Sequence, residues 1–404
     1  MEKPTILGGL KSKIKPFPTW PQWDKSDAKV LLEVLHSGKW SRRDVNNVAS
    51  HGAKSYINML EEESKARFNS KYSLTVSSGT AALDIAVKAI GISSGDEVIV
   101  PAYSFIATAT CVLHAGGIPV FADIDEDTWN IDVSKLDKHV SPKTKAIIAV
   151  HFAGQPADMS DLMSYAREKG LIVIEDAAQA IGAKWQDTSV GSIGDIGCFS
   201  LEMTKNLTCG EGGIIVTNNE DFYKKMYSLH LTGRSFNGSW YEHEELGWNY
   251  RITEFQAALA YNQMKNLDNQ ISIREKNAAK LNDLLSSLTG IGLTSIDPRV
   301  TTHAYHLFTF RFIPEEWTRF SRKRFILALN AEGIPCYEGY SYPIYKNPLF
   351  LSLGYEKYSL ICTNAEKITK QSLWLPQNVL LGDEQDIEEI FKAIEKIRYH
   401  FNIK

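Results

Sequence analysis

Short runs rich in β-forming residues alternate with stretches of helical periodicity between residues 73 and 217 of this sequence. Two of the runs, Ala146–Val150 and Leu171–Ile174, are apolar without alternation, as expected for strands that are buried on both faces. This order predicts an α/β fold in which helices cover a mostly parallel sheet. Ligands bind at the carboxyl ends of strands in such sheets, so polar residues there are the first candidates for a functional site. The predicted strands are Ser73–Val76, Glu97–Val100, Ile118–Ala122, Ala146–Val150, Leu171–Ile174, Gly197–Leu201 and Gly213–Thr217.

The sequence becomes strongly helical from residue 253 to about residue 288, with an apolar stripe that is interrupted only at Arg274. This pattern predicts one long helix that links a large unit to a smaller one. The smaller unit has a predicted strand at Tyr305–Phe312 and predicted helices at Ser321–Glu332 and Asp383–Arg398. We therefore expect two domains: a large one at residues 1–267, which includes the N-terminal segment, and a small α/β domain at residues 268–404.

The composition excludes several classes of protein. Hydrophobic residues make up 44% of the chain, too many for a disordered protein, and the net charge of -4 provides no basic field for nucleic acid. The five cysteines form no C-x-x-C pair, so we expect no metal site and a reducing compartment. Prolines and glycines interrupt the most apolar region, Val98–Ala122, and residues 1–14 lack the apolar stretch of a signal peptide. We expect a cytoplasmic enzyme for small molecules that binds neither nucleic acid nor membrane.

Three polar elements follow predicted strands. Ser77–Thr80 lies between a strand and a helix, where unpaired backbone N–H groups favour a phosphate, although helix capping explains such residues too. Asp176, within Glu175–Gln179, is placed either to hold a protonated ring nitrogen or to cap a turn. Lys205 lies between a strand and the glycine-rich turn Gly210–Gly213. Desolvation there would make it nucleophilic toward a carbonyl, whereas most lysines are solvated surface charges.

Together these elements supply what pyridoxal phosphate requires: an anchor for the phosphate, a carboxylate for the ring nitrogen and a lysine for the aldehyde. With further motifs, the chain resembles the DegT/StrS-type sugar aminotransferase family over nearly its whole length. The resemblance implies the aspartate-aminotransferase-like fold (fold type I), with a mixed, mostly parallel sheet in the large domain. The motifs that carry it are Ser77–Thr80, Glu175–Gln179, Gly191–Asp195, Phe199-Ser200 with Lys205, Gly210–Gly213, Asn249–Arg251, Thr253-Glu254 and Gln256–Ala258.

The resemblance also implies roles for residues around the cofactor ring. Lys205 is the catalytic residue, which attaches covalently to the cofactor's aldehyde and then moves a proton between the substrate and the cofactor as general base and acid. Asp176 pairs with the pyridine nitrogen, and Gln179 hydrogen-bonds the phenolic oxygen of the ring. Phe105 matches the position whose aromatic side chain stacks on the cofactor.

Further implied roles concern the cofactor's phosphate. Ser78, Gly79, Thr80 and Ser200 match the residues that hold it on the subunit to which the cofactor is bound. Asn249 matches a residue that family members contribute to the phosphate of the neighbouring subunit. The resemblance therefore implies a homodimer with two composite active sites.

Three other residues have two interpretations each. His306 and Tyr342 match small-domain positions that either face the substrate or do not, because side chains there vary with the sugar that is recognised. His151 follows a buried strand, so it either approaches the cofactor or is a near-core histidine whose hydrogen bonds are satisfied.

The reaction is expected to be a ping-pong transfer of an amino group from glutamine or glutamate. Lys205 argues against the branch of the family that carries histidine in its place and removes a hydroxyl from a sugar. Ile6–Gly9 and Pro16–Trp23 resemble the branch that acts on keto-cyclitols such as inososes, in aminocyclitol and antibiotic biosynthesis. Pro376-Gln377 departs from the histidine pair often found in that branch. The alternatives are a nucleotide-linked keto-sugar as the substrate, or a non-catalytic regulator that binds pyridoxal phosphate or a sugar.

Overall fold

A seven-stranded sheet forms the centre of the computed structural model, which describes residues 2–42, 55–318, 320–355 and 362–401. Its strands are β1 (Tyr72–Val76), β2 (Glu97–Pro101), β3 (Ile118–Ala122), β4 (Thr144–Val150), β5 (Ile172–Asp176), β8 (Ile196–Ser200) and β9 (Gly213–Thr217). They lie in the order β1-β9-β8-β5-β4-β2-β3. β9 is antiparallel to both of its neighbours, and the other pairs are parallel. The mostly parallel sheet is confirmed.

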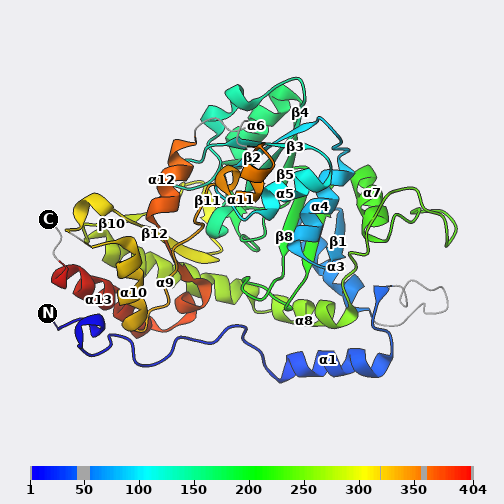
Figure 1. Ribbon diagram of the computed structural model, residues 1–404. Coiled ribbons are helices and arrows are strands. Elements are labelled where there is room, and N and C mark those ends of the chain that lie inside the picture. Colours follow the sequence, from blue (N-terminus) through cyan, green and yellow to red (C-terminus); the bar gives the residue numbers. More distant parts are fainter. Residues whose placement is uncertain (1, 43–54, 319, 356–361, 402–404) are drawn as a thin grey trace.

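Helices cover both faces of this sheet (Figure 1). One side holds α4 (Gly79–Ala89), α5 (Ala107–His114) and α7 (Glu220–His230), and the other holds α3 (Tyr56–Phe68), α6 (Met159–Lys169) and α8 (Glu254–Met264). Ala146 and Ile148 of β4 pack into the first of these layers, whereas Ile147 and Ala149 pack into the second. The strand is apolar without alternation because both of its faces are buried.

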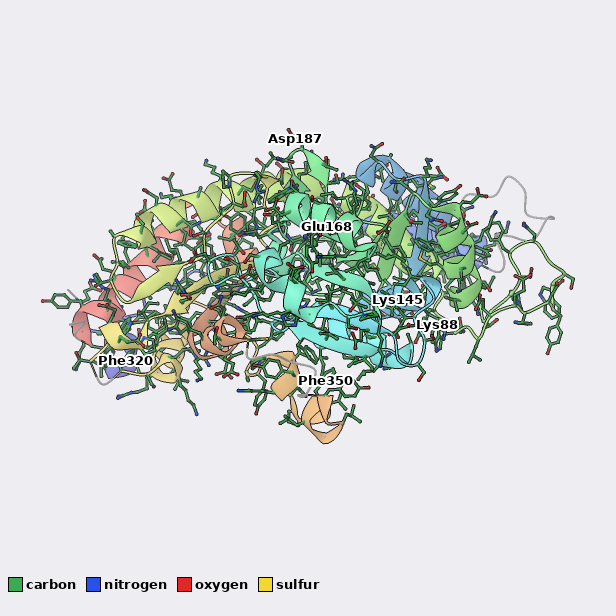
Figure 2. The ribbon with its side chains drawn as sticks, turned by 90° about the horizontal axis from the view of Figure 1, so that it is seen from above. Lys88, Lys145, Glu168, Asp187, Phe320 and Phe350 are labelled. Atoms are coloured by element: carbon green, nitrogen blue, oxygen red, sulfur yellow. The ribbon has the colours of Figure 1, made fainter. Side chains whose placement is uncertain are left out.

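A smaller antiparallel sheet places β12 (Leu307–Phe312) between β10 (Ile291–Leu293) and β13 (Ser372–Pro376). α9 (Leu267–Ser286), α10 (Arg322–Ala331) and α13 (Glu384–His400) pack on it around a separate hydrophobic core. Figure 1 shows these elements to one side of the large sheet, and in Figure 2 the labelled Phe320 and Lys88 lie in opposite halves of the molecule. The division of the chain at residues 267 and 268 stays a prediction.

The single long helix predicted from residue 253 to residue 288 is wrong, because α8 ends at Met264 and α9 begins at Leu267. Lys265 and Asn266 form a tight turn in which each N–H donates to the carbonyl three residues earlier. Before the turn α8 packs in the core on the large sheet, and after it α9 leads from that core to the core of the small sheet. The apolar stripe continues through the turn, and for this reason the periodicity did not reveal it.

The N-terminal segment runs along the base of the molecule from the C-terminal elements to α1 (Lys25–Ser37), which packs beside α8 (Figure 1). Lys13 Nζ lies 2.5 Å from Asp386 Oδ1 on α13 and 2.9 Å from Glu389 Oε2. The buried Glu332 carboxylate, at the end of α10, accepts hydrogen bonds from the N–H groups of Thr5 at 2.7 Å and Ser12 at 2.8 Å. The first residues of the chain are thus tied to elements formed near its end.

The remaining elements are short. All five cysteines are buried and none forms a disulfide, and no helix in the described ranges is both long and apolar enough to span a membrane. A third sheet joins β11 (Val300–Thr302), β6 (Lys184–Trp185) and β7 (Thr188–Ser189). The other helical segments are η1 (Thr5–Leu7), η3 (Val133–His139), η4 (Phe152–Gly154), η5 (Pro314–Glu316), η6 (Ile344–Lys346), α11 (Pro348–Ser352), α12 (Thr363–Gln371) and η8 (Gln377–Leu381).

Candidate active site

A cavity of about 860 Å³ opens at the carboxyl ends of β5 and β8, between the large sheet and residues of the small one. It brings together all the predicted cofactor residues except Asn249, along with His306. Its predicted lining residues are Ser78, Gly79, Thr80, Phe105, Asp176, Gln179, Ser200, Lys205 and His306. The structure therefore gathers residues that are more than 200 positions apart in the sequence at the edge where α/β sheets bind ligands.

The start of α4 is shaped to receive an anion. Ser78 caps the helix, and its hydroxyl oxygen accepts a hydrogen bond from the Ala81 N–H at 3.0 Å. Ser200 Oγ likewise accepts from the Glu202 N–H at 3.3 Å, so each hydroxyl retains its own O–H as a donor. A Cβ on Gly79 would lie 2.7 Å from the Ser200 Cβ, and only glycine allows the helix to start so close to β8. Hydroxyl donors and a helix N-terminus in one place fit a phosphate.

Asp176 ends β5 as a buried carboxylate without a cationic partner. Its side chain accepts a hydrogen bond from Thr108 Oγ1 at 2.8 Å and a longer one from the Ala178 N–H at 3.3 Å. Burial raises the pKa of Asp176, and no Lys, Arg or His of the described chain forms an ion pair with it. A protonated nitrogen bound beside it would supply the missing positive charge, which is the requirement of a pyridinium ring.

Lys205 reaches the cavity from the turn after β8. Burial lowers the pKa of Lys205 and outweighs the opposing effect of Glu202 and Asp176. Its Nζ lies 3.5 Å from Nε2 of His306, whose pKa burial, Lys205 and Arg274 together hold well below the usual range. Because its pKa is lowered, Lys205 lies closer to its nucleophilic, proton-accepting form than an exposed lysine does. The neutral imidazole of His306 lies beside this amine.

Gln179 is held in one orientation by the backbone. Its Oε1 accepts a hydrogen bond from the Ala153 N–H at 2.7 Å, which turns Nε2 toward the Tyr340 hydroxyl at 3.4 Å. Nε2 is therefore a donor at the cavity wall, suited to an oxygen atom on a ligand. Tyr340 packs 6.4 Å from the half-exposed ring of Phe105, measured between ring centroids.

Two predicted residues lie outside the lining of this cavity. Asn249 is exposed on the segment between α7 and α8, and its cross-subunit role stays a prediction. Tyr342 is 52% exposed and does not line the cavity, whereas Tyr340 does. The substrate role given to Tyr342 thus receives no support from its position in this chain.

His151 has both ring nitrogens occupied. Nε2 lies 2.9 Å from Glu175 Oε2, and Nδ1 accepts a hydrogen bond from the Ala157 N–H at 3.0 Å. The side chain is fully buried and does not line the cavity, so the interpretation as a satisfied near-core histidine holds. Glu175 also accepts from the N–H groups of residues 191, 193 and 194, which explains why that glycine-containing motif packs behind β5.

Several lining residues were missed because their place depends on tertiary structure. Trp20 comes from the N-terminal segment, and its indole N–H donates to the Met203 carbonyl at 3.0 Å. Tyr340 and Gln377 come from the C-terminal part, and Thr108 supports Asp176 from α5. Trp20 and Gln377 lie in segments that the sequence relates to the family's substrate branches, but neither segment by itself predicts a place in the cavity wall. No group of histidine, cysteine, aspartate and glutamate side chains in the described part of the chain is arranged to hold a metal ion.

Comparison with known proteins gives consistent matches over nearly the whole chain. The model of the DegT/DnrJ/EryC1/StrS aminotransferase family matches residues 25–395. A Streptoalloteichus tenebrarius protein designated L-glutamine:3-amino-2,3-dideoxy-scyllo-inosose aminotransferase is 33% identical over 412 residues, with 97% of each chain covered. The Bacillus subtilis spore coat polysaccharide biosynthesis protein SpsC is 35% identical over 387 residues, covering 93% of this chain and 95% of SpsC. The X-ray structure of an aminotransferase from Psychrobacter cryohalolentis is similar with a TM-score of 0.87 and 31% identity, covering 96% of this chain and 100% of that one.

Proposed function

This chain belongs to the DegT/DnrJ/EryC1/StrS aminotransferase family and is a pyridoxal 5′-phosphate-dependent aminotransferase, and we propose that it aminates a keto-cyclitol of the inosose type. The amino donor in this proposal is glutamine or glutamate, and the product belongs to aminocyclitol biosynthesis. The relative designated as an inosose aminotransferase and the N-terminal motifs support this substrate. Since the chain is an enzyme of this family, the non-catalytic alternative is not carried further.

The observation that carries the catalytic proposal is the convergence of Lys205, Asp176 and the start of α4 on one cavity. We assign the cofactor's phosphate to Ser78, Gly79, Thr80 and Ser200, where hydroxyl and backbone donors meet. Asp176 would accept a hydrogen bond from the protonated ring nitrogen, since no Lys, Arg or His among the described residues forms an ion pair with its carboxylate. When bound, pyridoxal phosphate supplies an aldehyde that takes up the amino group and a ring that withdraws electrons.

The other side chains orient the ring and handle the proton. Gln179 Nε2 would donate to the phenolic oxygen, and the Phe105 side chain would stack on the ring. Lys205 Nζ holds and moves the proton of the reacting carbon. Its lowered pKa supports this role, because an amine whose pKa is lowered by burial gives up its own proton more readily and can then accept one. His306, at 3.5 Å from Nζ, is placed to receive a hydrogen bond from the lysine.

The acceptor is tested with purified enzyme and a panel of keto-substrates. Glutamine or glutamate should change the absorbance of the yellow holoenzyme without any acceptor, and Lys205→Ala should abolish this change. Inososes and nucleotide-linked keto-sugars are then supplied separately, and the aminated product is detected by mass. Amination of an inosose supports the proposal. Amination of nucleotide-linked sugars alone contradicts it and favours the second candidate, which the similarity to a polysaccharide biosynthesis protein supports.

The quaternary structure and the compartment belong to the same proposal. We infer a homodimer in which Asn249 of each subunit completes the phosphate site of the other, a role that its exposed position allows. We also infer a cytoplasmic location, which the five buried cysteines without disulfides support. Sedimentation of the holoenzyme as a monomer would contradict the first inference.

A further inference from the structure

A buried cation without an anionic partner lies where α9, η8 and the N-terminal segment meet. Arg274, on α9, has no exposed surface, and its Nε and Nη2 donate to Gln377 Oε1 at 2.9 and 2.5 Å. Its guanidinium carbon lies 5.3 Å from the centre of the Trp20 ring. Nη1 has no hydrogen-bond partner, and no carboxylate of the described chain forms an ion pair with this arginine.

The chemistry of the pair fixes the orientation of Gln377. A guanidinium has only donors, so the side-chain atom that two of its nitrogens approach must be the amide oxygen. The Nε2 of Gln377 is therefore turned away from Arg274. Nε2 donates to no described residue. Because it is not one of the fully buried polar atoms without a partner, it keeps some accessible surface, and this surface opens on the cavity that Gln377 lines.

The backbone around Gln377 is held firmly. Asn277 Nδ2, one turn along α9 from Arg274, donates to the carbonyls of Leu380 at 2.8 Å and Gly382 at 2.9 Å. η8 is thereby fixed on α9, and the amide donor has a defined position. The N-terminal segment closes the corner, because Asn378 Nδ2 donates to the Pro18 carbonyl at 2.8 Å.

A buried positive charge, that of Arg274, lies behind this corner of the cavity. Burial lowers the pKa of Arg274 to about 9, which still leaves the guanidinium charged at neutral pH. His306, whose pKa Lys205 and Arg274 help to lower, contributes no negative charge. A buried charge that no protein carboxylate compensates is costly, and an anion bound at the amide in front of it would recover part of that cost.

We propose that Gln377 Nε2 binds the carboxylate of the amino donor, with Arg274 as the positioning residue that orients and polarises the amide. The identity of this anion rests on the proposed function, in which the keto-cyclitol is neutral and the donor carries the carboxylate. A hydrogen bond from an amide that is itself bonded to a cation is stronger than one from a free amide. The pair is thus a donor-recognition element.

The test measures binding of glutarate, a dicarboxylate that lacks an amino group and cannot react, to the holoenzyme by calorimetry. Gln377→Glu keeps an acceptor for Arg274 but replaces the amide donor with a negative charge. We expect its glutarate Kd to rise at least tenfold, about 1.4 kcal/mol. Gln385→Glu, on the exposed face of α13, adds the same charge outside the cavity and should leave the Kd within twofold of wild type.

A second pair of variants tests Arg274. Arg274→Met removes the cation without leaving a buried charge, so folding should be retained, as circular dichroism would verify. We expect a glutarate Kd raised about tenfold, with partial recovery in Arg274→Lys because that change keeps the charge. Calorimetry with uridine diphosphate tests whether Arg274 and Gln377 contribute to binding a nucleoside diphosphate instead.

Kinetic measurements distinguish an effect on the amino donor from an effect on the keto acceptor. In Gln377→Glu, the donor kcat/KM, followed as the absorbance change without acceptor, should fall at least tenfold, whereas the acceptor KM should change less than twofold. The proposal would be overturned if glutarate binding were unchanged in Gln377→Glu or if the acceptor KM rose. It would also be overturned if the variants lost binding of uridine diphosphate instead of binding of glutarate. If no inosose is aminated, the proposed acceptor fails, yet the glutarate titration still decides this inference.

Discussion

The Asp176 carboxylate is placed for the ring nitrogen, but its charge is buried. Replacing it should therefore lower activity and raise stability. Asp176→Asn removes a buried charge while keeping an oxygen that accepts from Thr108. We expect the apoenzyme to become more stable at neutral pH, whereas kcat falls at least tenfold, about 1.4 kcal/mol of barrier. Denaturant unfolding of apoenzyme and steady-state kinetics measure the two effects. The same exchange at the exposed Asp283 should alter neither.

The gain in stability from Asp176→Asn should depend on pH, in a direction that the raised pKa of Asp176 determines. Because burial raises the pKa of Asp176, the folded apoenzyme retains a proton at pH values where the unfolded chain has already lost it. Stability attributable to Asp176 therefore falls as the pH rises from the usual aspartate range through the raised pKa. The advantage of Asp176→Asn should grow over the same interval. An advantage that is constant from pH 4 to pH 8 would contradict the burial of the charge.

Gly79 is required for space rather than for backbone conformation. In Gly79→Ala the new methyl would meet the Ser200 Cβ at 2.7 Å and its Cα at 3.2 Å. We expect the free energy of unfolding of the apoenzyme to fall by about 1–3 kcal/mol, as for other overpacked sites. In a Ser200→Gly background the shortest of these contacts disappears, so the cost of Gly79→Ala should shrink. Equal costs in both backgrounds would show that the contact is relieved by other movements.

At the scale of elements, the end of α10 anchors the N-terminal segment through one carboxylate. Glu332 lies 2.6 Å from Lys396 on α13 and binds the N–H groups of Thr5 and Ser12. Burial alone would raise the pKa of Glu332, but the hydrogen bonds from Lys396, Thr5 and Ser12 outweigh it and lower that pKa. Its contribution to stability is therefore present above the usual glutamate pKa and is lost as the pH falls through the lowered value.

Glu332→Gln should release the N-terminal segment before the rest of the molecule. Breaking a buried ion pair costs about 3–5 kcal/mol when one partner is removed, and part of this cost falls on residues 5–13. We expect trypsin to cleave the folded variant faster than wild type in that segment, as mass spectrometry of early fragments would show. Glu315→Gln, at an exposed position, provides the control. Equal cleavage rates would mean that Glu332 does not hold the segment.

The elements also show what the sequence could reveal. The strands of the large sheet were predictable because each is a short β-rich run bounded by a helical stretch or a turn, and β5 and β8 led directly to Asp176 and Lys205. The turn at Lys265 and Asn266 was not predictable, since the apolar stripe continues through it. Trp20, Tyr340 and Gln377 reach the cavity only through long-range packing, and no periodicity records that.

At the scale of the whole molecule, the proposed composite site predicts complementation between two inactive variants. Lys205→Ala disables the subunit that carries it, and Asn249→Ala should impair the neighbouring subunit's phosphate site. Mixed in equal amounts and reassociated at random, they form mixed dimers in about half of the population, each with one intact site. Activity should therefore recover to about a quarter of wild type. No recovery, with mixed dimers demonstrated by mass, would place Asn249 and Lys205 in the same site.

The contact between Lys13 and Asp386 also has a consequence for the order of synthesis. The two residues are separated by 373 positions, so Lys13 leaves the ribosome long before its partner exists. At about 5–20 residues per second the wait is roughly 20 to 75 s. During that interval Lys13 has neither of its two carboxylate partners, because both belong to α13. Translation must therefore reach the last helix before a nascent chain can fasten its own N-terminal segment there.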